Sequence, residues 1–91
     1  MAELIAVGTA QADSADFTNT SGTDLAIFLK TAASQTLPND AKALIQVKSS
    51  EGAYFDIGVL TAVEPMRLLS APGTFRVRRL ACAVGFGVDK T

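Results

Sequence analysis

Short segments of alternating apolar and polar residues, separated by turn-forming clusters, are the feature that most constrains this fold. The clearest segment is Thr74–Arg78, in which Phe75 and Val77 alternate with polar residues. Side chains two residues apart lie on the same face of a strand. The pattern therefore predicts a strand whose Phe75 and Val77 face the core. Arg76 and Arg78 then lie side by side on its outer face.

The same alternation predicts two further strands earlier in the chain. In Asp24–Lys30, three aliphatic side chains fall on one face, and Phe28 falls on the other as a candidate exposed aromatic. In Leu44–Lys48, Ile45 and Val47 face inward, and Gln46 and Lys48 point to water. The residues between these strands, 31–42, include a proline and an asparagine that argue against a long helix. We expect a loop there.

A hairpin is predicted over residues 44–60. The cluster Ser49–Gly52 forms its turn. The returning strand, Tyr54–Leu60, places Phe55, Ile57 and Val59 on one face.

The end of the chain predicts a last strand. Val84, Phe86 and Val88 alternate there with Gly85 and Gly87. A glycine on the outer face of a strand often marks the close approach of another backbone segment. We therefore expect other backbone to pass near this strand.

Together these segments make seven or eight short strands with turns at regular intervals. This spacing predicts an all-β fold, a small two-sheet β-sandwich of the Ig-like or jelly-roll-like kind. The 91 residues leave room for one domain, residues 1–91. Residues 1–20 alternate weakly, so they are expected either to join their own sheet or to form an N-terminal arm or exchanged edge strand.

A net charge of −1 conceals an uneven distribution of charge. Residues 1–24 carry four acidic and no basic side chains, whereas residues 65–91 carry five basic and one acidic. The two ends neutralise each other either inside one fold, if the first and last strands lie together, or between subunits. The low net charge also disfavours nucleic-acid binding.

The residues that most enzymes need are scarce. The chain has no histidine, the commonest general base at neutral pH, and its single cysteine is Cys82. One cysteine can form neither an internal disulfide nor a tetrahedral zinc site. Cys82 is interpreted as a buried structural thiol. We expect a protein that is not an enzyme and that uses no metal or cofactor.

No targeting or membrane signal stands out in the sequence. An acidic residue, Glu3, occupies the place where a signal peptide would carry basic charge, and no apolar run is long enough to cross a membrane. We expect a protein that is made in the cytoplasm and has no membrane partner.

Interaction with other protein is predicted instead. Charged residues make up only 19% of the chain, and interfaces are depleted of charge. Arg76, Arg78 and Arg79 are the candidate contact residues, because arginine is enriched in interfaces and pairs bidentately with carboxylates. A solvated outer face is the alternative reading of this cluster. Phe28 and Tyr54 are the candidate exposed aromatics.

Turn-to-strand junctions follow one another in a recognisable order over about three quarters of the chain, from residue 21 to residue 89. The segments that carry this order are Ser21–Thr23, Leu25–Lys30, Ile57–Thr61, Pro65, Leu69–Arg79, Val84 and Gly87–Asp89. Over residues 21–89 the pattern resembles small virion proteins of tailed bacteriophages. The resemblance implies a structural protein such as a capsid decoration or cement protein, typically a small β-sandwich that often forms dimers or trimers.

We therefore expect a virion protein of the capsid surface, made in the host cytoplasm. Its partner would be the major capsid protein or another virion protein, with Arg76, Arg78 and Arg79 as contacts. A tail, adaptor or fibre-associated component of the particle is the first alternative. A carbohydrate- or surface-binding β module is the second, and it would use Phe28 and Tyr54, because sugar sites usually need exposed aromatics.

Overall fold

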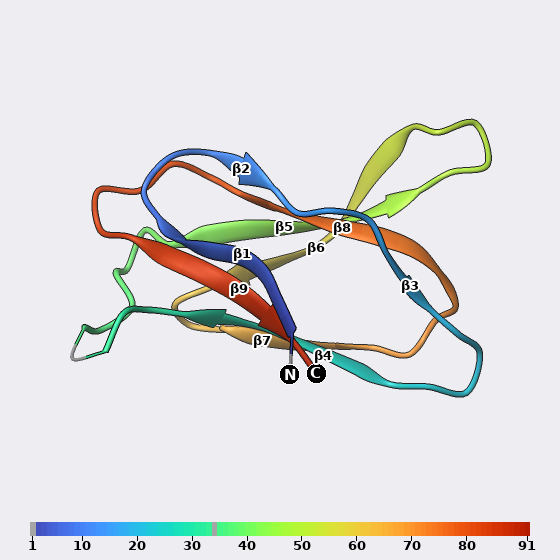
Figure 1. The fold of residues 1–91 in the computed structure, drawn as a ribbon, viewed down its shortest axis with the longest axis horizontal. Coiled ribbons are helices and arrows are strands. Elements are labelled where there is room, and N and C mark those ends of the chain that lie inside the picture. The colour runs from blue at the N-terminus through green and yellow to red at the C-terminus, as the bar shows by residue number, and fades with distance from the viewer. Residues whose placement is uncertain (1, 34) are drawn as a thin grey trace.

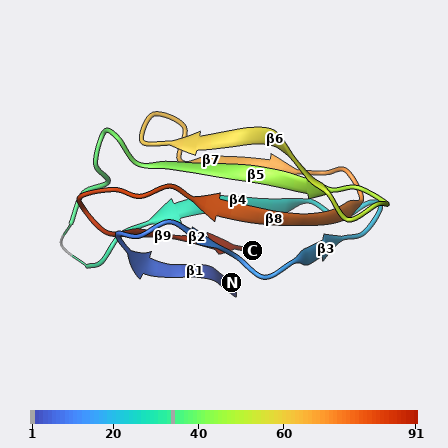
Figure 2. The same ribbon diagram turned by 90° about the horizontal axis from the view of Figure 1, so that it is seen from above.

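The structure is a computed structural model that describes residues 2–33 and 35–91. Its strands form two packed sheets (Figures 1 and 2). The strands are β1 (Ala2–Gly8), β2 (Ala12–Asp13), β3 (Phe17–Asn19), β4 (Leu25–Lys30), β5 (Lys42–Lys48), β6 (Tyr54–Thr61), β7 (Met66–Leu69), β8 (Gly73–Arg79) and β9 (Phe86–Lys90). The loop predicted between β4 and β5 is present on both sides of Ser34, which lies outside the described residues.

The order of the strands identifies the kind of sandwich. The first sheet has the order β1-β9-β4-β7, and the second has the order β2-β8-β5-β6, with β3 also paired to β8. Because β2 and β3 both pair with β8, they count as one interrupted strand, so the described residues form eight strands in two antiparallel sheets of four. This is the arrangement of a jelly roll. The predicted two-sheet β-sandwich is confirmed, in its jelly-roll form.

The core lies between the two sheets, where the alternating residues meet. Phe75 and Val77 of β8 face Ile27 of β4 and Phe86 and Val88 of β9, and none of the five side chains is more than 2% exposed. The inward faces predicted for these three strands are therefore correct. Fully burying each of these side chains contributes about 1.5–3 kcal/mol to stability.

The N-terminal segment closes both sheets within its own chain. β1 pairs with β9 at the edge of the first sheet, and β2 and β3 pair with β8 at the edge of the second. The first and last strands therefore lie together. This is the arrangement expected if the charges of the two chain ends are compensated inside one fold. Exchange of this segment between subunits stays a prediction.

A bulge in β1 places its backbone directly over Gly87. The register of β1 against β9 shifts between Ile5 and Gly8, where β1 has one residue more than β9. A Cβ atom on Gly87 would lie 2.5 Å from the carbonyl oxygen of Ile5 and 2.9 Å from the amide nitrogen of Val7. The expected close approach of other backbone to the last strand is confirmed.

A second bulge breaks the face predicted for β6. The pairing of β6 with β5 shifts by one residue, and Ile57 is left without a partner on β5. Phe55, before the bulge, lies on the core side of the sheet, whereas Val59, after it, lies on the outer side. The prediction that these three side chains share a face is wrong, because a single extra residue reverses the alternation.

Candidate interaction surfaces

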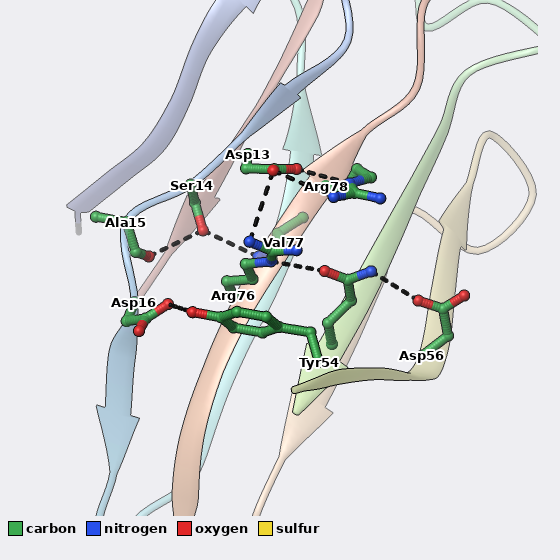
Figure 3. Close-up of polar contacts among 10 residues, drawn as sticks. Asp13, Ser14, Ala15, Asp16, Tyr54, Asp56, Arg76, Val77 and Arg78 are labelled. Atoms are coloured by element: carbon green, nitrogen blue, oxygen red, sulfur yellow. Dashed lines mark hydrogen bonds and ion pairs between the residues drawn. The ribbon is translucent and has the colours of Figure 1, made fainter. Parts of the chain in front are cut away.

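The outer face of the second sheet carries a polar network that crosses its strands (Figure 3). We call this set the polar network: Asp13, Asp16, Gln46, Tyr54, Asp56, Arg76 and Arg78. At one side, Arg78 Nε donates a hydrogen bond of 2.7 Å to Asp13 Oδ1. Arg76 lies 3.6 Å from the other carboxylate oxygen of Asp13. One aspartate of the N-terminal segment thus pairs with two arginines of β8.

Arg76 lies at the centre of the polar network. Its guanidinium carbon is 3.6 Å from the centroid of the Tyr54 ring, a cation–π contact. Its Nε donates to Gln46 Oε1 at 2.7 Å, and Gln46 Nε2 donates to Asp56 at 2.8 Å. Gln46 is therefore buried, and the prediction that it points to water is wrong, because Arg76 and Asp56 bind its amide on the outer face.

Tyr54 anchors the other end of the polar network. Its hydroxyl donates to Asp16 Oδ1 at 2.7 Å, and Lys48 Nζ lies 3.3 Å from Asp16 Oδ2. The hydrogen bond from Tyr54 is the main cause that lowers the pKa of the Asp16 carboxyl, and the same bond raises the pKa of Tyr54. Tyr54 is half-buried, with Arg76 stacked on its ring, and is not a freely exposed aromatic.

Ser14 holds the two aspartates in place over the sheet. Its amide donates to the Val77 carbonyl at 2.8 Å, and the Val77 amide donates to the Ser14 hydroxyl at 2.9 Å. A side-chain oxygen thus takes the place of a backbone acceptor at the interruption between β2 and β3. The interruption costs the strand pairing little, and it projects Asp13 and Asp16 toward the basic residues of the sheet.

These contacts decide how part of the uneven charge is compensated. Asp13, from the acidic start, pairs with Arg76 and Arg78, from the basic end. On the first sheet, Lys30 Nζ lies 2.6 Å from both Glu3 and Asp89. The hydrogen bond to Asp89 is the main cause that raises the pKa of Lys30. At these places opposite charges pair inside one fold. This agrees with the expectation of compensation within the fold rather than between subunits.

Replacing Asp13 by asparagine should make the protein less sensitive to acid. The hydrogen bond from Arg78 lowers the pKa of Asp13 in the folded protein. The carboxylate therefore stabilises the fold at pH values above the pKa that Asp13 has in the unfolded chain. That contribution is lost as the pH falls below about 4. Because Asp13 is exposed, we expect the Asp13→Asn variant to lose less than about 1 kcal/mol at pH 7. Urea unfolding at pH 7 and pH 3 measures the effect, and an equal loss of stability on acidification in both proteins would contradict it.

Arg79 does not belong to the surface on which it was predicted. Its side chain is only 5% exposed overall and lies on the core side of β8. Its Nε donates to the Ala10 carbonyl at 2.9 Å, and its Nη1 donates to the carbonyls of Ala6 at 2.6 Å and Phe86 at 2.8 Å. The prediction of Arg79 as a partner contact is therefore wrong, because backbone carbonyls of its own chain already bind its guanidinium.

An apolar patch lies on the outer face of the first sheet, beside its β7 edge. Phe28 faces outward and lies opposite Met66 of β7, and Ala26 lies opposite Leu68. Met66 is 57% exposed and Leu68 is 62% exposed, and Val63, in the turn before β7, is 90% exposed. We call these five residues the apolar patch.

Phe28 is half-buried rather than exposed, because β4 is an inner strand with neighbours on both sides. The prediction for Phe28 is therefore correct for its face and wrong for its exposure. Val63, Met66 and Leu68 were not among the predicted contact residues. The available signal was the alternation of Met66 and Leu68 around Arg67, which places both apolar side chains on one face of a short strand.

Searches of protein-family models, of curated proteins and of solved structures find no match to this chain. Within residues 2–33 and 35–91, the surface has no pocket. In the same ranges, no three His, Cys, Asp or Glu side chains are grouped so that they could hold a metal ion. The described part of the chain also has no helix long and apolar enough to cross a membrane.

Proposed function

We propose that this protein is a structural component of a tailed-phage particle that decorates the outer capsid. The resemblance over residues 21–89 supports the proposal, and so does the jelly-roll fold, which viral capsid domains use. A fold alone does not define a function. The observation that carries the proposal is the apolar patch, in which Met66 and Leu68 are exposed on the outer face of the first sheet beside the half-buried Phe28.

The two outer faces differ in what they offer a partner. On the second sheet, Arg76 and Arg78 are already bound by Asp13, and Arg76 also contacts Gln46 and Tyr54, so both guanidiniums have partners inside the chain. On the first sheet, Val63, Met66 and Leu68 stand exposed beside an edge strand. Contiguous exposed apolar surface of this kind marks protein-interaction sites. We therefore place the main capsid contact at the apolar patch, with Arg76 and Arg78 as secondary candidates.

The mechanism of such a protein is mechanical. Each copy lays its apolar patch across neighbouring capsid subunits and removes that apolar surface from water. The gain is about 25 cal/mol for each Å² of apolar surface buried. Bridging contacts add interface area between subunits, so the shell resists the outward pressure of packaged DNA.

Quantitative mass spectrometry of purified particles, scaled to the major capsid protein, tests the proposal. Near-stoichiometric copies of this chain are expected for a decoration protein. A few to a few dozen copies would instead indicate a tail, adaptor or fibre-associated component. Absence from the particles would overturn the proposal of a virion protein.

Leu68→Asp should weaken binding to capsids about tenfold or more without unfolding the domain. The side chain is 62% exposed, so the substitution removes apolar contact area and adds a charge that a partner must desolvate. Binding is measured by co-sedimentation of the purified protein with capsids that lack it. Val84→Asp is the matched control, because Val84 is an exposed aliphatic residue in the loop before β9, outside the apolar patch. Equal losses in both variants would exclude the apolar patch as the contact surface.

A further inference from the structure

β6 is the edge of the second sheet that is least protected against pairing. It has eight residues and, within the described part of the chain, it pairs only with β5. The other side of β6 therefore presents unpaired backbone N–H and C=O groups, which act as a template for another strand. Its sequence contains no lysine, arginine or proline, and its only charge is Asp56.

Each of the other edge strands has stronger features that oppose pairing with a further strand. β7 has only four residues, follows Pro65, and turns Arg67 inward toward Gly58. β1 is interrupted by two register shifts. β2 and β3 have two and three residues. Short strands, proline, inward charges and bulges are the devices by which edges avoid pairing. β6 has one bulge and one carboxylate.

The middle of β6 also carries large apolar side chains that are exposed. Phe55 is 58% exposed and Ile57 is 47% exposed, although both are large apolar residues. Phe55 lies opposite Val47, which itself pairs with Phe75 of β8, and the β5–β6 hairpin extends beyond the other strands only at its turn (Figure 1). Figure 2 shows β6 at the outer margin of the molecule, on the side opposite β1. This edge combines unpaired backbone with apolar side chains that lack a partner in the described chain.

We infer that β6 pairs antiparallel with β6 of a second copy, across a two-fold axis near Ile57. This register sets Ile57 against its own counterpart. The two Asp56 carboxylates then do not face each other. An apolar side chain therefore meets its own counterpart at the axis, and no like charges are directly opposed.

The composition of β6 favours a second copy over a different protein. A strand with one acidic and no basic side chain offers little charge pattern for another protein to recognise. Self-pairing requires only that the two Asp56 side chains are not directly opposed. A two-fold axis near Ile57 meets this requirement. Most soluble oligomers are symmetric homo-oligomers with such isologous contacts. The pair forms one continuous sheet across both molecules.

Sedimentation equilibrium of the purified full chain tests the inference. The wild-type protein should move from 9.5 kDa to twice that mass as its concentration rises. Ile57→Lys should raise the dissociation constant about tenfold or more, because a lysine on an edge strand opposes pairing. Leu68→Lys is the control, since Leu68 is also exposed but lies on the apolar patch, and its dissociation constant should not change. A wild-type monomer at every concentration overturns the inference, and so does a dimer that only Leu68→Lys disrupts.

Hydrogen exchange of the wild-type protein gives a second test that does not depend on the folding of a variant. Amides of residues 54–61 should exchange more slowly at high than at low protein concentration, and those of β1 and β7 should not change. Unchanged exchange in β6 in a dimeric sample overturns strand pairing. Both experiments are done without capsids, so a monomer that still binds capsids refutes only this inference. A β6-paired dimer that is absent from particles refutes only the proposed function.

Discussion

Arg79→Met should lower the melting temperature of this protein by roughly 12–24 °C, measured by circular dichroism at neutral pH. Arg79 joins β8 to three separate places in the chain. Its guanidinium donates to carbonyls of β1, of the link between β1 and β2, and of β9. These segments close the edge of the first sheet and lead into the second. Loss of Arg79 therefore weakens the junction of the two sheets.

The size of the effect follows from the groups left without donors. Methionine fills a similar volume but donates no hydrogen bond, so the carbonyls of Ala6, Ala10 and Phe86 lose the guanidinium. A buried polar group left unpaired costs about 1–3 kcal/mol. Removing a buried charge returns part of this cost. We expect a net loss of about 3 kcal/mol, and each kcal/mol lowers the melting temperature of a domain this size by roughly 4–8 °C.

The adjacent arginine provides the control. Arg78→Met changes the same residue type in the same strand, but Arg78 lies on the outer face and binds Asp13. Its melting temperature should change far less than that of Arg79→Met. Arg79→Lys should fall between wild type and Arg79→Met, because a single ammonium cannot match the fork that reaches three carbonyls. Similar losses at positions 78 and 79 would show that the carbonyl contacts of Arg79 do not stabilise the fold.

The burial of Arg79 could have been predicted from the alternation that revealed β8. Phe75, Val77 and Arg79 are two residues apart, so all three lie on the inner face. The sequence analysis instead treated three nearby arginines as one surface cluster. A charged residue on the core side of a regular strand indicates a structural role, because burial requires several hydrogen-bonding partners.

The two-sheet architecture was predictable for a related reason. Short alternating segments such as Thr74–Arg78 can bury their apolar face only against another sheet. The jelly-roll order was not predictable, because it depends on pairings between segments that are distant in sequence. β1 with β9 and β4 with β7 are examples. Local patterns report which face of a strand is buried but not which strand lies beside it.

The bulges show a second limit of local patterns. Nothing in residues 54–61 marks Ile57 as an extra residue, since the insertion exists only relative to β5. The prediction for this strand therefore failed on faces, although its bounds were nearly correct. Exposure was misjudged for a similar reason. Gln46 and Phe28 point outward as expected, but neighbouring strands cover them, and those neighbours were unknown.

Gly87 is the opposite case, because this one residue of the sequence did indicate a contact between the last strand and a distant backbone segment. Gly87→Ala should destabilise the protein by about 3 kcal/mol or more, because overpacking against rigid neighbours costs about 1–3 kcal/mol and here the neighbour is backbone. The new Cβ would lie 2.5 Å from the Ile5 carbonyl oxygen. Real Cβ atoms do not approach an oxygen so closely, so the β1 bulge must move off β9. Urea unfolding measures the loss.

The neighbouring glycine separates this clash from a general cost of substitution. A Cβ on Gly85 would have a Val7 methyl group at 3.3 Å as its nearest contact, and a side chain can rotate away. Gly85→Ala should therefore cost less than about 1 kcal/mol. Hydrogen exchange should show faster exchange of the β1 amides in Gly87→Ala but not in Gly85→Ala. If both variants keep wild-type stability, β1 adapts without loss and the bulge does not require glycine at position 87. If only Gly87→Ala frees β1, the last strand tolerates its bulged partner because this one position has no side chain.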